Sequence, residues 1–158
     1  MGTSFEMKLL TNSEKKADKA ERIALAEIAR LSSILSSYDP GSEFSRWLNT
    51  QNQPIKASPE LIEVLSLFEK WNIKTHGAIN PAFASINILW KNAAKFQQIP
   101  SREKLDQAIV DAAQQHWQID YQLSTITHLS KSPLSINTFV KSYIMDRVVK
   151  KVKDETAI

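Results

Sequence analysis

An apolar stripe with helical spacing runs through residues 20 to 35. It consists of Ala20, Ala24, Ile28, Leu31 and Leu35. Side chains three and four positions apart share one face of an α-helix, so this period predicts a long helix that ends near Ser36. Thr11 and Glu14 have the spacing of a capping box just before it. A helix with such a face needs a second layer to cover it, so we expect a layered domain.

Three further helices are predicted downstream. Ser58 and Pro59 supply an N-cap and a first-turn proline for a helix whose apolar face continues to Trp71. Pro100 and Ser101 open another helix. Residues 81–96 are predicted to form a helix between these two. Its inward-facing residues are expected to be Ile86, Leu89, Trp90 and Ala93.

Alternating apolar and polar residues predict the strands. Residues 3–10 alternate, and so do residues 117–123, which predicts a strand with one face in water. Residues 124–129 should form a second strand that pairs with residues 117–123. Residues 134–136 are predicted to form a short strand that runs into a helix from about Thr138, with Asn137 as the N-cap.

The order of these elements predicts an α/β fold, with a mixed or antiparallel sheet packed against helices. The chain has 158 residues, no internal repeat and no linker-like segment, so residues 1–158 are expected to form a single domain.

Composition excludes several kinds of site. The chain has no cysteine, which excludes disulfides, thiolate metal sites and cysteine nucleophiles. Its three histidines lack metal-ligand spacing and are interpreted as surface or loop residues. The net charge is +3, and the basic cluster at residues 147–153 is followed directly by Asp154 and Glu155 without interleaved aromatic residues. We therefore expect no nucleic-acid partner and interpret the cluster as a solvated helix end.

Two segments carry candidate functional residues. At the junction of residues 136–141, a chain segment enters a helix N-terminus, which favours anions such as phosphate, and Lys141 adds a positive charge there. The junction is also explained by a plain N-cap followed by a surface lysine. Trp47 lies in a polar segment, where either core packing or stacking on a ligand would account for it.

Several segments, in order, resemble the FAD:protein FMN transferases of the ApbE family, formerly called thiamine-biosynthesis lipoproteins. Met1-Gly2-Thr3 is similar to the family's Met-Gly-Thr opening. Residues 35–49 (LSSYDPGSEFSRWLN) resemble its Ser-x-Tyr-x-x-x-Ser segment, with Trp47 as an insertion. Residues 75–81 (THGAINP) resemble Thr-x-Gly-Ala-Phe-Asp-Pro. Residues 136–147 (INTFVKSYIMDR) resemble Leu-Asn-Ser-Ile-Ala-Lys-Gly-Tyr-x-x-Asp-Arg.

The resemblance implies a fold, a reaction and a site. Family members bind FAD and Mg²⁺ and transfer FMN, through a phosphoester, to a threonine of a target protein. By resemblance, Met1 and Tyr38 would line the flavin, Thr138 and Lys141 would lie near the diphosphate and adenosine, and the Val140 carbonyl would be a magnesium ligand. Family members are usually exported and often lipid-anchored, which implies a periplasmic or membrane-anchored protein.

The chain departs from the family at matching positions. His76, Asn80 and Ser135 stand where the family has aspartates. Val140 stands in place of an alanine, and Ser142 in place of a glycine. The resemblance covers the N-terminal half of the family fold.

Three interpretations therefore stay open. The first is the N-terminal portion of a transferase, inactive alone, and the second is a degenerate flavin-binding module. The third is a protein-interaction domain. Whether the chain is an enzyme stays open with them. Because half of a shared sheet exposes an edge, we expect association with a missing C-terminal half or with itself.

Overall fold

The long helix predicted from the apolar stripe is confirmed. In the computed structural model of the chain, which describes residues 5–156, α1 spans Glu14–Leu35. The stripe residues Ala20, Ala24, Leu31 and Leu35 are all fully buried. The N-cap is Ser13, whose hydroxyl accepts from the Lys16 N–H at 3.4 Å. The capping box is corrected accordingly, because the Thr11 hydroxyl instead accepts from the Ser13 N–H.

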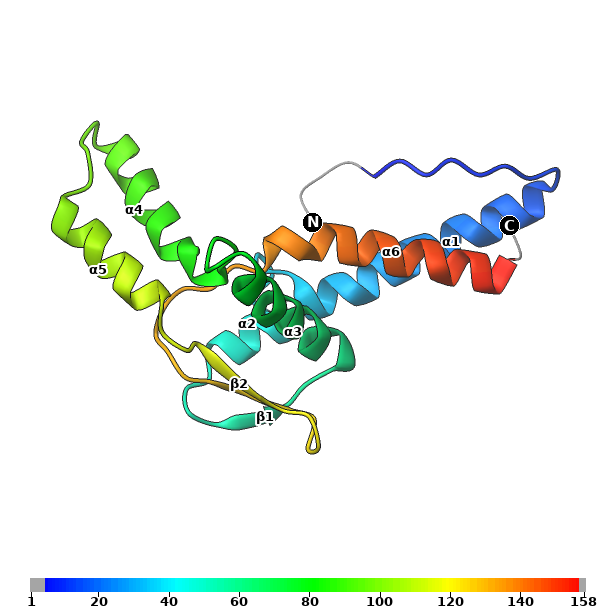
Figure 1. Cartoon of the computed structure of the whole chain (residues 1–158). Coiled ribbons are helices and arrows are strands. Elements are labelled where there is room, and N and C mark those ends of the chain that lie inside the picture. The colour runs from blue at the N-terminus through cyan, green and yellow to red at the C-terminus, as the bar shows by residue number, and fades with distance from the viewer. Residues whose placement is uncertain (1–4, 157–158) are drawn as a thin grey trace.

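Helix α6 (Asn137–Thr156) lies along α1, and Figure 1 shows these two long helices side by side. Its buried face consists of Val140, Tyr143, Ile144, Val148, Val152 and Thr156. Helix α3 (Pro59–Lys74) packs against both, and Ser58 caps it as predicted. The three helices supply most of the hydrophobic core.

The sheet is small and antiparallel, with strand order β1-β3-β2. Strands β2 (Trp117–Asp120) and β3 (Thr125–His128) form the predicted hairpin, with Trp117 opposite His128. The sequence did not indicate β1 (Pro54–Lys56), which pairs with β3 through Ile55 opposite Ile126. The fold class, helices with an antiparallel sheet, is confirmed.

Residues 43–48 form a short helix rather than a loop. Helix α2 (Glu43–Leu48) is capped by Ser42 and buries Phe44 and Trp47. The Trp47 ring lies 5.1 Å from that of His128, measured between ring centroids. Trp47 is fully buried, so it belongs to the core and does not stack on a ligand.

Helices α4 (Ala84–Lys95) and α5 (Arg102–Ala112) form a hairpin that projects from the body of the molecule (Figure 1). A 3-10 turn, Pro81–Phe83, leads into α4. None of the residues of α4 is buried, and Trp90 is 50% exposed. The prediction that Trp90 faces inward is therefore wrong, because α4 packs mainly on α5.

Two predicted strands are absent from the described residues. Residues 5–10 form no strand, although Met7 and Leu9 pack against the core and residues 6, 8 and 10 face solvent. Their alternation reflects this one-sided contact. Residues 134–136 also form no strand. The Ser135 N–H donates to the Pro81 carbonyl at 2.9 Å instead.

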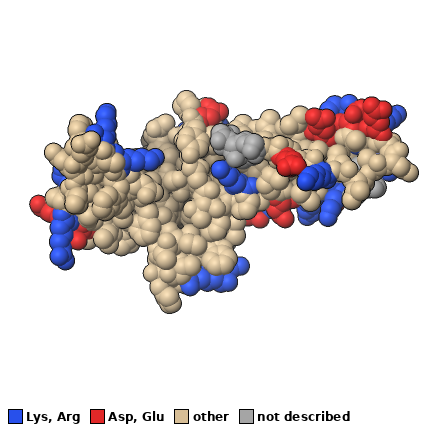
Figure 2. Space-filling view, turned by 90° about the horizontal axis from the view of Figure 1, so that it is seen from above, with Lys and Arg blue, Asp and Glu red and all other residues tan. Residues whose placement is uncertain are grey.

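Ion pairs join the three core helices. The buried carboxylate of Glu27 accepts from Arg30 and from Lys151, each at 2.7 Å, which lowers the pKa of Glu27 to about 2. Arg147 pairs with Glu63 on α3. Figure 2 shows acidic and basic side chains interspersed at the end of the molecule that carries the start of α1 and the end of α6. No helix within residues 5–156 is long and apolar enough to cross a bilayer.

Candidate functional site

A cavity of about 540 Å³ lies where the end of α1 meets the first turns of α6. These two segments are about 100 residues apart in sequence, and the packing of α6 along α1 brings them together. The lining residues are Ser32, Leu35, Ser36, Ser37, Tyr38, Asn137, Val140, Lys141 and Ile144. We call this cavity the Tyr38–Lys141 cleft.

The loop after α1 is fixed by local hydrogen bonds. The Ser36 hydroxyl accepts from the N–H groups of Tyr38 at 3.2 Å and Asp39 at 3.1 Å. The Asp39 carboxylate accepts from the Gly41 N–H at 2.8 Å, which closes a turn on the aspartate side chain. These bonds hold the backbone of Tyr38, and the residue stays 78% exposed.

Asn137 connects the two sides of the cleft. Its side-chain amide donates to the Tyr38 hydroxyl at 3.2 Å, and its carbonyl oxygen accepts from Ser37 at 3.4 Å. Asn137 is the first residue of α6 and not its N-cap, since the N–H groups of Phe139 and Val140 donate to the Ile136 carbonyl. The amide is therefore directed to the neighbouring loop rather than to its own helix.

The structure brings together part of the predicted site. Tyr38, Val140 and Lys141 all line the cleft. Thr138 lies in the same helical turn but is exposed and does not line it. Met1 lies outside the described residues.

The cleft is suited to an anion. Lys141 is exposed at its rim, and no carboxylate stands among the described residues that line it. No hydrogen bond within the described part of the chain satisfies the N–H groups of Asn137 and Thr138. Free N–H groups and the helix dipole make the N-terminus of a long helix favourable for phosphate groups.

A magnesium ion does not fit the described residues by themselves. Val140 offers a backbone carbonyl within α6, and no described group of three acidic or histidine side chains could hold a metal. Mg²⁺ requires close to six oxygen ligands, of which this cleft supplies too few.

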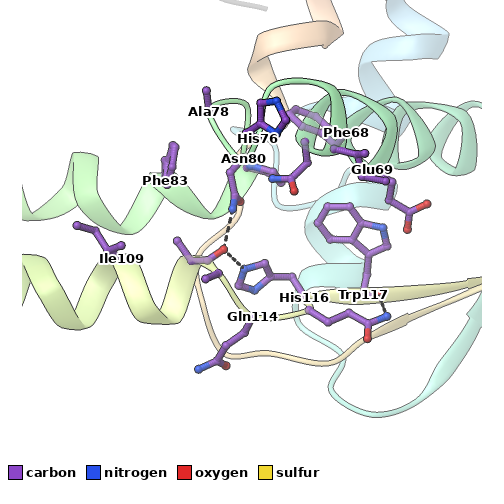
Figure 3. Close-up of a pocket in the computed structure, with 17 residues that line it drawn as sticks. Phe68, Glu69, His76, Ala78, Asn80, Phe83, Ile109, Gln114, His116 and Trp117 are labelled. Carbon is purple, nitrogen blue, oxygen red and sulfur yellow. Dashed lines mark hydrogen bonds between the residues drawn. The ribbon is translucent and has the colours of Figure 1, made fainter.

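A larger cavity, of about 810 Å³, lies between α3, the loop of residues 76–81 and α5 (Figure 3). The THGAINP segment thus lines a pocket, through His76, Gly77, Ala78, Asn80 and Pro81. In Figure 3, the side chains of Asn80 and His116 point to one acceptor, the Ala112 carbonyl, at 2.6 and 3.2 Å. Sequence analysis missed this pocket, because its walls come from segments without a shared motif.

Two histidines are core residues rather than surface residues. His116 and His128 are 4% and 5% exposed, whereas His76 is exposed as interpreted. The Nδ1 atom of His116 lies 2.7 Å from the Ser130 hydroxyl. Burial lowers the pKa of His116, so the neutral ring is favoured.

The chain is similar to a curated FAD:protein FMN transferase of Chlamydia pneumoniae. The two are 25% identical over 150 residues, which cover 92% of this chain and 45% of that protein. The chain thus spans about half the length of the curated relative that it matches.

Solved structures share the fold. The apo flavinyl transferase ApbE of Pseudomonas stutzeri superposes with a TM-score of 0.72 at 19% identity, over 87% of this chain and 46% of that one. The ApbE protein of Thermotoga maritima gives a TM-score of 0.73 at 17% identity, over 90% of this chain and 47% of that one. The model of the ApbE family matches residues 1–157. This chain therefore belongs to the ApbE family.

Proposed function

We propose that this chain is the N-terminal portion of an FAD:protein FMN transferase and that FAD binds in the Tyr38–Lys141 cleft. The observation that carries the proposal is the meeting of Tyr38, Asn137 and Lys141 around one cavity at a helix N-terminus. The proposed reaction is the transfer of FMN from FAD to a target protein, as the name of the Chlamydia relative states, with a threonine as the acceptor by family resemblance.

Each residue of the cleft has a role in this proposal. Tyr38 lines the flavin from the loop, and Asn137 holds its hydroxyl. Lys141 and the N–H groups of the first turn, with Thr138, bind the diphosphate and the adenosine part. Met1, by family resemblance, completes the flavin wall.

Transfer of FMN would need Mg²⁺, which supplies charge stabilisation at the diphosphate when bound. The Val140 carbonyl is one proposed ligand, and the remaining oxygens would come from outside the described residues. We accordingly propose that the chain alone binds FAD without transferring FMN. A flavin-binding module without activity is the second candidate, favoured by the absence of carboxylates among the described residues of the cleft.

The proposed partners are FAD, a target protein, and either a missing C-terminal half or a second copy of the chain. Exposed apolar side chains on the α4–α5 hairpin, including Trp90 and Ile109, support association. By family resemblance, we also propose a periplasmic or membrane-anchored location. Light scattering over a range of concentrations tests association, and a monomer throughout would contradict self-association.

The test is titration of the chain with FAD, followed by quenching of flavin fluorescence with and without Mg²⁺. We expect saturable binding that Lys141→Ala weakens about tenfold, which is typical for the loss of a charge-assisted contact. Lys153→Ala is the matched control, because Lys153 is an exposed lysine on the same helix but does not line the cleft. Equal affinity of the two variants would remove Lys141 from the site.

A second readout separates binding from transfer. The chain is incubated with FAD, Mg²⁺ and a protein to which the Chlamydia relative transfers FMN, and the mass of that protein is measured. We expect no added FMN. A mass increase of one FMN group would show that the chain is active alone.

A further inference from the structure

The pocket between α3 and α5 is separate from the Tyr38–Lys141 cleft, and the two share no lining residue. At about 810 Å³, it has the size of a small-molecule site. Its walls are largely apolar. The larger apolar side chains that line it are Phe68, Ile73, Phe83, Ile109 and Trp117.

The hydrogen-bond donors of the pocket walls are directed into the protein's own backbone. Side-chain N–H groups donate to the carbonyls of Ile79, Ala112 and Trp117. The residues that donate in this way are Asn72, Asn80, Gln115 and His116. These bonds use one N–H of each amide, and the second N–H of Asn72, Asn80 and Gln115 stays open to a ligand.

The acceptors remain available. The side-chain carbonyl oxygens of Asn72 and Gln115 accept no hydrogen bond within the described residues. The carboxylate of Glu69 forms no ion pair with any described residue. Apart from histidines, Glu69 carries the one formal charge among the described lining residues, and no lysine or arginine stands among them.

Glu69 is exposed and lies at the rim of the pocket. The partly buried surroundings of its carboxylate raise its pKa, and the indole N–H of Trp117 acts against that rise. This N–H is buried and makes no hydrogen bond of normal length, although Figure 3 shows the Glu69 side chain beside the indole. An external cation would supply the charge partner that the described residues do not.

We propose that this pocket binds an organic cation: a protonated amine, amidine or guanidine carried on an apolar body. The charged group donates to the Glu69 carboxylate and to the free oxygens of Asn72 and Gln115. The apolar body lies against the accessible apolar residues of the pocket wall, which include Ile73, Phe83 and Ile109. The anionic diphosphate of FAD is disfavoured here, so this site lies beyond the function proposed above.

The probe is benzamidine, compared by titration calorimetry with its neutral isostere benzamide and its anionic counterpart benzoate. We expect saturable one-to-one binding of benzamidine, with benzamide at least about tenfold weaker, because a charge-assisted hydrogen bond is lost. Benzoate should not bind. Glu69→Gln keeps the shape of the side chain and should weaken benzamidine binding about tenfold.

Glu103→Gln is the matched control, since Glu103 is an exposed glutamate of α5 that does not line the pocket. It should leave benzamidine binding unchanged. N-acetylarginine amide distinguishes the source of the cation: tighter binding than benzamidine assigns the pocket to a basic side chain of a polypeptide, and weaker binding assigns it to a free amine or amidine. No saturable binding of either cation, equal binding of benzamide, or an unchanged Glu69→Gln variant would overturn the proposal.

Discussion

The side-chain amide of Asn137 donates to the Tyr38 hydroxyl at 3.2 Å, across 99 positions of sequence. This bond joins the first turn of α6 to the loop after α1, and both residues line the same cavity. Because Tyr38 is largely exposed, the amide restricts a ring that would otherwise have several rotamers. The contact therefore prepares one wall of the proposed FAD site before a ligand arrives.

Asn137→Ala should lower the affinity for FAD about fivefold, which corresponds to the loss of one net hydrogen bond of about 1 kcal/mol. Tyr38→Phe removes the same bond from the other side. The double variant should therefore bind FAD about as weakly as either single variant, measured by fluorescence titration. Asn87→Ala on the distant α4 is the control. Additive effects of Asn137→Ala and Tyr38→Phe would show that the bond does not position the ring.

Glu27→Gln should destabilise the protein by roughly 1–3 kcal/mol at neutral pH, because Lys151 loses its carboxylate partner while Arg30 keeps its ion pair with Glu60. The pKa of Glu27 is lowered from 4.5 to about 2. This contribution is thus complete above pH 4.5 and is lost as the pH falls toward 2. Urea unfolding at pH 6 and pH 3 measures it.

The variant Glu27→Gln should show a smaller loss of stability between these two pH values than the parent chain. Glu21→Gln, an exposed residue of the same helix, is the control and should behave as the parent does. An equal acid-induced loss in Glu27→Gln would place the titrating carboxylate elsewhere.

His116 should make the fold sensitive to mild acid. Burial lowers its pKa from 6.5, so the folded state binds the proton less well than the unfolded state. Stability is therefore complete above about pH 6.5 and falls as the pH drops below it. Thermal melts at pH 7.5 and pH 5.5 should show a lower Tm at the acid value.

The matched pair for this measurement is His116→Gln and His76→Asn. His116→Gln should be less stable at pH 7.5 by about 1–3 kcal/mol, owing to its broken bonds to Ser130 and Ala112, but should lose less on acidification. His76 is exposed with a φ of 50°, a conformation that asparagine tolerates, so His76→Asn should match the parent. Identical acid sensitivity in His116→Gln would refute the assignment.

Elements with a complete local pattern could be predicted from the sequence. The α1 stripe, the Ser58 cap and the β2–β3 hairpin depend on neighbours along the chain, and the structure has all of them. Residues 5–10 of the strand expected at residues 3–10 form no strand, because alternation identifies the side chains that face the core but not a partner strand. Strand β1 was missed because three residues with exposed ends carry almost no period.

The site was predictable only in part. Tyr38, Val140 and Lys141 lie in segments with a family resemblance, and tertiary packing brings them to one cleft. The role of Asn137 was misjudged, because a capping side chain and one that reaches another loop look identical in sequence. The pocket at Glu69 and Trp117 had no local signal at all, since α3, the loop of residues 76–81 and β2 meet there only after folding.

The α4–α5 hairpin is only weakly coupled to the rest of the fold. Helix α4 buries none of its residues and contacts chiefly α5, so few interactions couple it to the remainder of the core. Twelve-residue helices have little stability of their own. We therefore expect the hairpin to open as a unit of its own, so that its amide hydrogens exchange with solvent through local unfolding while those of α1 and α6 exchange only when the whole domain unfolds.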